Sequence, residues 1–154
     1  MRSAKAEELF ALLACEQGLP ISKSRAAEML WCDIDSKRAA NNLYQILHNI
    51  KKAAPNVSAA IILTRGAIQL DTSRAMTDTE KFMALYNSPE PKDWVAAINL
   101  YRGILLMDNK YDWANEYEAY YDICYYEMQN RLEKYYAEIG NINMSRYYRD
   151  KALE

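Results

Sequence analysis

Hydrophobic residues recur three and four positions apart along residues 4–16, which predicts an α-helix that Gly18 and Pro20 bring to an end. Ser22 is a favourable N-cap, because its hydroxyl can accept a hydrogen bond from a backbone N–H in the next turn. A second, shorter helix is therefore expected after it, with an apolar side made of Ala26, Ala27, Leu30 and Trp31.

Turn and cap residues at 33–36 lead into a third helix, predicted from Lys37 to about Ala54 and ended by Pro55 and Asn56. The period of the pattern then changes. Residues 60–64 and 67–70 are rich in β-branched and aliphatic side chains and flank a two-residue turn, Arg65-Gly66, which predicts a β-hairpin.

After Leu70 the pattern is helical throughout. A short helix over 78–86, capped at Thr77 or Asp78, ends at the Pro-rich stretch 89–91. Further helices are expected over 92–106, over 113–139 and from 143 to the end, with a tight break at 140–141. We place a domain boundary within residues 71–76, so that the predicted domains are 1–73 and 74–154.

The order helix, short helix, turn, longer helix and hairpin is that of a winged helix-turn-helix, in which the third helix enters the major groove of DNA. Projecting residues 37–54 at 100° per residue places one apolar stripe on the core side, made of Ala39, Leu43, Ile46, Leu47, Ile50 and Ala53. The opposite arc carries cations and amides and has no carboxylate: Lys37, Arg38, Asn41, Gln45, His48, Asn49 and Lys52, with Tyr44 and Lys51 at its edge.

This arc suits a DNA-reading helix, because Lys and Arg contact phosphates or guanine while Asn and Gln pair with adenine. The candidate DNA-binding residues are Lys37, Arg38, Asn41, Gln45, His48, Lys51 and Lys52. Lys23 and Arg25 on the preceding helix are added as phosphate contacts, and Arg65 as the tip of the wing. The alternative for the same face is a solvated polar surface on an ordinary helix.

Charge is distributed unevenly over the 154 residues: the chain has a formal charge of −2, which divides into +2 over residues 1–73 and −4 over 74–154. His48 is the sole histidine, and the four glycines are isolated, so we predict no catalytic triad, phosphate loop, metal site or cofactor. The carboxylates of residues 108–138 are interpreted as polar helix faces, and the protein is predicted not to be an enzyme.

Three widely spaced cysteines favour idle thiols in a reducing cytosol. No apolar run approaches the ~20 residues of a membrane span, and the charged N-terminus lacks a signal-peptide core. We therefore expect a cytoplasmic protein without membrane partners.

Several ordered segments resemble the SARP-like bacterial transcriptional activators, which join an OmpR-type winged helix to a bacterial transcriptional activator domain of tetratricopeptide-like helices. In the first half these are Lys5-Ala6-Glu7-Glu8-Leu9-Phe10, Pro20-Ile21-Ser22-Lys23, Leu30-Trp31-Cys32-Asp33 and Ala39-Ala40-Asn41-Asn42-Leu43-Tyr44. In the second half they are Thr77-Asp78-Thr79-Glu80, Ala97-Ile98-Asn99-Leu100-Tyr101-Arg102, Tyr111-Asp112-Trp113-Ala114, Tyr136-Ala137-Glu138-Ile139-Gly140 and Lys151-Ala152-Leu153.

The resemblance implies a mainly α protein, with a winged helix-turn-helix and one β-hairpin followed by a tetratricopeptide-like α-helical domain. It also implies a transcription regulator, the output part of a SARP-like or response-regulator protein, that binds double-stranded promoter DNA. Its protein partners would be RNA polymerase, a regulatory domain or a second copy. Two departures are that the sequence begins almost directly on the first helix, without the family's N-terminal β-sheet, and that it stops where a second helical hairpin would be expected. In addition, Cys32 stands where the family usually has Pro.

In the second half, alanines are expected to pack against tyrosine rings between antiparallel helices. The small positions are Ala97, Ala114, Ala119, Ala137 and Ala152. Adjacent tyrosines on a helix point in different directions, so some rings at 120–121, 125–126, 135–136 and 147–148 should be exposed for a partner. The alternative function that remains is a helical protein-interaction module whose degenerate winged helix does not bind DNA.

Overall fold

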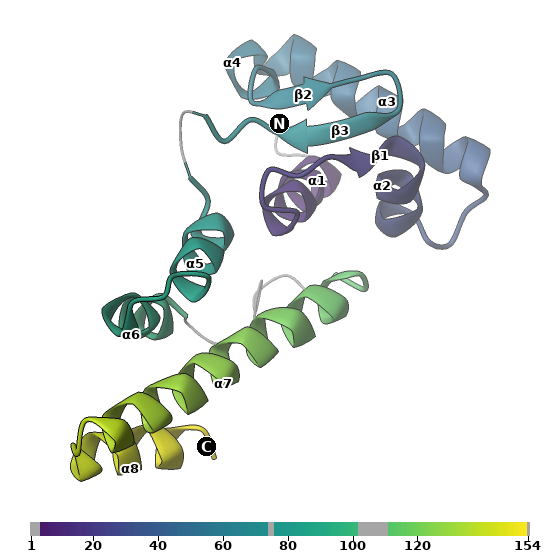
Figure 1. The fold of residues 1–154 in the computed structure, drawn as a ribbon. Helices are drawn as coiled ribbons and strands as arrows, with labels where there is room; N and C mark the ends of the chain where they lie inside the picture. The colour runs from purple at the N-terminus through teal and green to yellow at the C-terminus, as the bar shows by residue number, and fades with distance from the viewer. Residues whose placement is uncertain (1–3, 74–75, 102–110, 154) are drawn as a thin grey trace. The chain divides into compact units, whose positions relative to one another are not determined.

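The computed structural model describes residues 4–73, 76–101 and 111–153. Within these residues the chain forms eight helices and a small three-stranded antiparallel sheet (Figure 1). The mainly α class predicted from the sequence is confirmed. The chain divides into two compact units, Met1–Glu80 with Tyr111–Trp113 and Lys81–Lys110 with Ala114–Glu154. No helix in the described ranges is both long and apolar enough to cross a membrane.

The first unit packs its helices around a core of aliphatic side chains. Its helices are α1 (Ala4–Cys15), α2 (Lys23–Leu30), α3 (Ser36–Ala53) and α4 (Pro55–Ser58). Fully or almost fully buried between them are Leu9, Leu12, Leu13, Ala26, Ala27, Leu30, Ala39, Leu43 and Ile68. Since these residues recur at helical spacing on α1, α2 and α3, the apolar pattern accounts for how the three helices meet.

Side-chain caps determine where α2 and α3 begin. The hydroxyl of Ser22 accepts a hydrogen bond from the backbone N–H of Arg25 at 3.1 Å, as predicted. Asp35 caps α3 in the same way, accepting from the N–H of Arg38 at 3.0 Å. The third helix ends one residue before the predicted Ala54, but Pro55 does not lead into a loop. It occupies the first turn of α4, where proline is tolerated because the N–H it lacks has no helical partner.

The predicted hairpin is present as β2 (Ile61–Leu63) and β3 (Ala67–Leu70), joined through Arg65 and Gly66. A third strand, β1 (Ile21–Ser22), was not predicted; it pairs with β3, which makes the strand order β1-β3-β2. Ile68 on the central strand pairs with both Ile21 and Leu63 and is fully buried. The sheet therefore ties the start of α2 to the hairpin.

The first unit also buries a carboxylate, which two donors stabilise, one from the same helix and one from a distant position in the chain. Glu8 is 7% exposed, receives a hydrogen bond from the indole of Trp113 at 3.1 Å and pairs with the Lys5 ammonium at 2.7 Å. The same ammonium donates to the carbonyl of Leu30 at 2.5 Å. Because a buried charge is costly without partners, these contacts hold α1, the end of α2 and Trp113 together.

The second unit consists of stacked helices. Helix α5 joins the first unit to the second. The helices are α5 (Asp78–Tyr86), α6 (Pro91–Leu100), α7 (Ala114–Glu138) and α8 (Ile142–Lys151), with α7 packed against both α6 and α8. Thr77 and Glu80 form a capping box at the start of α5, each accepting from the other's backbone N–H. The core is made of Phe82, Met83, Ala97, Ile98, Tyr121, Cys124, Met128, Leu132 and Tyr148.

Two predictions for the second half need correction. The helix expected over 92–106 ends at Leu100, because Tyr101 has extended backbone angles, φ −68° and ψ 121°; residues 102–106 lie outside the described part. Ala119 and Ala137, expected to be packing positions, are exposed. They project from the side of α7 that faces away from its neighbours, whereas Ala97 and Ala114 are buried as predicted.

Adjacent tyrosines do point in different directions. Tyr121 and Tyr148 are 4% and 5% exposed and belong to the core, whereas their neighbours Tyr120 and Tyr147 are 47% and 51% exposed. Successive helical residues are separated by about 100°, so one ring of each pair has to leave the core. The sequence prediction that some tyrosine surface is exposed is confirmed.

Arg131 on α7 connects three helices of the second unit. Its guanidinium lies over the rings of Tyr86 and Trp94, at 4.5 and 5.6 Å from their centroids. It donates to the carbonyl of Tyr86 at 3.0 Å and to Glu127 at 2.7 Å, and the hydroxyl of Tyr86 donates to the other oxygen of Glu127 at 2.6 Å. The hydrogen bond to Glu127 raises the pKa of Tyr86 to about 12, and the bonds from Tyr86 and Arg131 lower the pKa of Glu127.

We expect the hydroxyl of Tyr86 to make the second unit sensitive to alkali. A raised folded-state pKa means that its contribution is complete below the unfolded pKa of about 10 and is lost as the pH rises towards 12. The Tyr86→Phe variant keeps the ring under Arg131 but lacks this titration. Urea unfolding followed by circular dichroism should therefore show a steeper loss of stability between pH 10 and 12 in the wild type. Equal slopes for both proteins would contradict the hydrogen bond.

Candidate nucleic-acid interface

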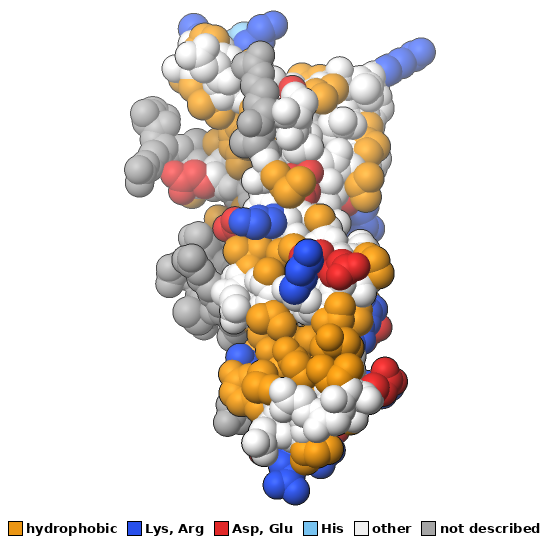
Figure 2. Space-filling view, turned by 60° about the vertical axis from the view of Figure 1, so that its left-hand side comes forward, with side chains coloured by type: hydrophobic (Ala, Val, Ile, Leu, Met, Phe, Trp, Pro, Cys, Tyr) orange, Lys and Arg blue, Asp and Glu red, His pale blue; other side chains and the backbone are white. Residues whose placement is uncertain are grey.

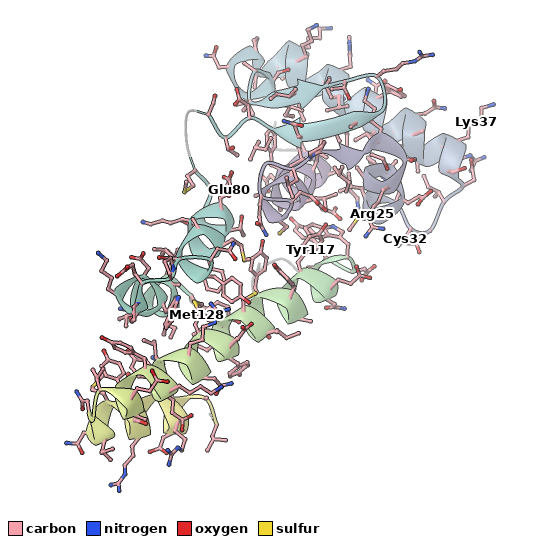
Figure 3. The ribbon with its side chains drawn as sticks, in the orientation of Figure 1. Arg25, Cys32, Lys37, Glu80, Tyr117 and Met128 are labelled. Atoms are coloured by element: carbon pink, nitrogen blue, oxygen red, sulfur yellow. The ribbon has the colours of Figure 1, made fainter. Side chains whose placement is uncertain are left out.

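The solvent-facing side of α3 carries all seven side chains that the sequence predicted for DNA contact. Each is exposed: Lys37, Arg38, Asn41, Gln45, His48, Lys51 and Lys52. Five of them, at positions 37, 41, 45, 48 and 52, recur every three or four residues and form one line along the helix. Lys37 extends into solvent at the N-terminal end of this line (Figure 3). The helix therefore presents a continuous polar and cationic face.

The core-facing stripe of α3 agrees with the prediction except at its C-terminal end. Ala39, Leu43, Leu47 and Ile50 are buried. Ile46 is half-buried and Ala53 is exposed, which corrects the expectation that both belong to the core. The reason is an open apolar groove of about 840 Å³ beside this end of the helix, lined by Ala6, Glu7, Phe10, Ile46, Asn49, Ile50, Lys52, Ala53, Ala54 and Val57.

Two contacts on α3 constrain its candidate residues. Arg38 forms an ion pair with the capping carboxylate of Asp35 at 3.3 Å, although the side chain of Arg38 remains 79% exposed. The exposed arc itself has no carboxylate. The ion pair with Asp35 nevertheless partly neutralises the positive charge in the first turn of α3. Gln45 donates to Asn49 at 3.0 Å, which orients its amide along the helix. Lys37, Lys51 and Lys52 are the cations that determine the charge of this face.

Lys23, which the sequence suggested as a phosphate contact, also binds the turn of the hairpin. Its backbone N–H donates to Gly66 at 3.0 Å, and its ammonium donates to the carbonyl of Thr64 at 2.6 Å and lies 3.5 Å from that of Arg65. The ammonium also lies 5.8 Å from the ring centroid of Tyr44. Lys23 thus fixes the hairpin tip beside α3, because its donors are used on the turn.

The turn between β2 and β3 leaves Arg65 exposed at its tip, next to the cationic face of α3. Blue side chains project from this part of the first unit at the top of Figure 2. Arg25 is also exposed, on α2, and its phosphate contact stays a prediction. His48 and Lys51 of α3 line one pocket together with Leu63 of β2, so this part of α3 adjoins the hairpin.

A small pocket between α3 and the hairpin was not predicted. It has a volume of about 190 Å³ and is lined by Lys23, Tyr44, Leu47, His48, Lys51, Ser58, Ile61 and Leu63. Tyr44 and Leu63 expose 59% and 51% of their surface at its margin. In the sequence, the position of Tyr44 at the edge of the helical arc was the signal for this pocket. The strand residues that line it are distant from Tyr44 in the sequence and come next to it only when the chain folds.

Chemically, this surface offers cations for phosphates, amides for base edges and an aromatic ring next to two lysines. In the ranges that the structure describes, no group of three or more His, Cys, Asp or Glu side chains is arranged to hold a metal ion. Comparison with known proteins found no matching family model, no matching curated protein and no matching solved structure.

Proposed function

We propose that the chain is a DNA-binding transcription regulator whose first unit is a winged helix-turn-helix. In this proposal α3 enters the major groove and Arg65 reaches the adjacent backbone or minor groove as the tip of the wing. The observation that carries it is the exposed face of α3, which combines lysines and amides without a carboxylate, next to a hairpin tip that Lys23 holds in place.

The dimensions of α3 suit the task. Its eighteen residues correspond to a rod of about 27 Å, and the major groove, about 12 Å wide, admits one α-helix. Asn41 lies between Lys37 and the middle of the helix, where an amide can pair with adenine while the flanking lysines contact phosphates. Cations at both ends of one face would hold the helix along the groove.

The second unit is proposed to contact proteins rather than DNA. Residues 81–110 with 114–154 carry a net charge of −2, which does not favour phosphate, and exposed tyrosines on α7 and α8 provide amphipathic surface. The resemblance to SARP-like activators supports the assignment to transcription, with RNA polymerase, a regulatory domain or a second copy as the partner. The polar face of α3 supports only the DNA-binding part of the proposal and not the role in transcription.

Salt dependence tests the proposal directly. The full chain is titrated against a fluorescent random duplex while the salt concentration is varied. Neutralising about four phosphates predicts that log Kobs falls linearly with log salt, with a slope of about −3 to −4. A promoter fragment from the same genome should then bind more tightly than the random duplex at physiological salt.

Absence of binding at low salt, or binding that does not change with salt, would contradict the proposal. Either result would favour the second candidate, a protein-interaction module whose winged helix has lost DNA binding. The specific observation in favour of that candidate is the ion pair between Asp35 and Arg38, because it neutralises one cation where the helix would approach DNA.

A further inference from the structure

We infer that the N-terminal half of α7 is a docking surface for a basic amphipathic helix of another protein. The surface consists of Ala119, Tyr120, Ile123 and Tyr126, which we name the α7 stripe. Tyr120, Ile123 and Tyr126 expose 47%, 65% and 43% of their surface. The inference deepens the interaction role proposed for the second unit and does not require that the first unit bind DNA.

The α7 stripe is separate from the packing face of its helix. The buried residues of α7, among them Tyr121, Cys124, Met128 and Leu132, lie on the side that faces the core of the second unit. The stripe residues recur at positions 119, 120, 123 and 126, which places them along the opposite side over about 10 Å of helix.

The spacing of the stripe suits a helical partner. Apolar side chains three and four positions apart form a ridge that fits between the corresponding side chains of a second helix. Tyrosine rings add hydroxyl groups that remain solvated at the margin, as is usual in surfaces that bind partners transiently. Because the stripe spans only about two turns, we expect a weak, reversible complex.

Charge identifies the chemistry of that partner. Residues 114–130 contain four carboxylates, Glu116, Glu118, Asp122 and Glu127, and no lysine or arginine. Arg131 pairs with Glu127, whereas the partner of Asp122 is the hydroxyl of Tyr101 rather than a cation. The stripe therefore lies in a negative field, which attracts lysine and arginine side chains flanking an apolar ridge and repels an acidic helix.

The test uses the full chain and two labelled peptides of about 15 residues, long enough to form a helix on binding. One peptide has leucines at helical spacing with lysine elsewhere, and the other has the same leucines with glutamate in place of lysine. Fluorescence anisotropy should give a dissociation constant in the micromolar range for the Leu/Lys peptide, weakening as salt rises. Binding of the Leu/Glu peptide should be at least about tenfold weaker, which corresponds to about 1.4 kcal/mol.

Paired variants locate the site. Tyr120→Ser with Ile123→Ser should weaken binding of the Leu/Lys peptide at least fivefold, whereas Ile139→Ser with Tyr147→Ser, at residues 57% and 51% exposed, should leave it unchanged. Equal binding of both peptides, or equal loss in both pairs of variants, would overturn the inference. So would a stripe-dependent dimer on gel filtration. Because the stripe variants should retain salt-dependent DNA binding, failure here is distinguishable from failure of the proposed function.

Discussion

Lys51→Glu combined with Lys52→Glu is expected to abolish retention of duplex DNA. Both ammonium groups lie exposed in the last turn of α3, on the face proposed to approach phosphates. The double change removes two cations and places two carboxylates against a polyanion. Since like charges brought together at an interface cost several kcal/mol, affinity should fall by at least about a hundredfold at low salt. Electrophoretic mobility shift with a random duplex measures the loss.

A second effect of the same change has to be separated from the first. Lysines in the last turn interact favourably with the helix dipole, so reversing them should also weaken α3 by about 0.3–1 kcal/mol each. Lys51→Gln with Lys52→Gln removes the charge without adding repulsion. This milder variant should keep its helical content by circular dichroism and should lower the slope of log Kobs against log salt by about two.

The matched control is Lys92→Glu with Lys134→Glu, which changes the net charge equally at two exposed positions of the second unit. It should bind DNA nearly as well as the wild type, because α6 and α7 have no proposed contact with the duplex. If both double reversals weaken binding equally, net charge and not the face of α3 controls it. Unchanged retention by the α3 variant would contradict the assignment of α3 as the recognition helix.

Most helices of this chain could be predicted because their signals lie among neighbouring residues. Ser22 and the turn at 33–36 are recognisable beside the helices that they precede, and the apolar period of residues 37–54 identifies the buried side of α3 at Ala39, Leu43, Leu47 and Ile50. Strand β1 has two residues and exists only because β3 pairs with it, so local periodicity carries no signal for it. The early end of α6 at Leu100 has only a weak signal in the sequence, Gly103, because an isolated glycine is tolerated within a helix.

The sequence predicted which residues make up the candidate site, but it did not predict the contacts that these residues make. A helical projection is enough to collect Lys37, Asn41, Gln45 and Lys52 on one face. It does not show that Asp35 pairs with Arg38, because the cap lies outside the projected helix. Nor does it show that Lys23 is bound to the hairpin, because its partners Thr64 and Arg65 are distant in sequence. Contacts of this kind depend on the packing of α2 against the sheet.

Gln129 is the least favourable residue in the core of the second unit. It lies in α7, is 0% exposed, and neither its side-chain nitrogen nor its oxygen has a hydrogen-bond partner in the described part of the chain. The amide therefore loses its hydration on folding and gains nothing in return, which costs about 1–3 kcal/mol. Its neighbours in sequence include Met128 and Leu132, which are also fully buried but apolar.

Gln129→Met is expected to stabilise the protein, against the usual direction of core substitutions. Methionine keeps the unbranched length of glutamine and fills the same space without a polar atom, so the variant should gain about 1–3 kcal/mol. Urea unfolding and hydrogen exchange of α7 amides measure the gain. Asn130→Met, at the exposed neighbouring position, should change stability by less than about 0.5 kcal/mol. A Gln129→Met protein less stable than the wild type would contradict the assignment of Gln129 as an unsatisfied amide.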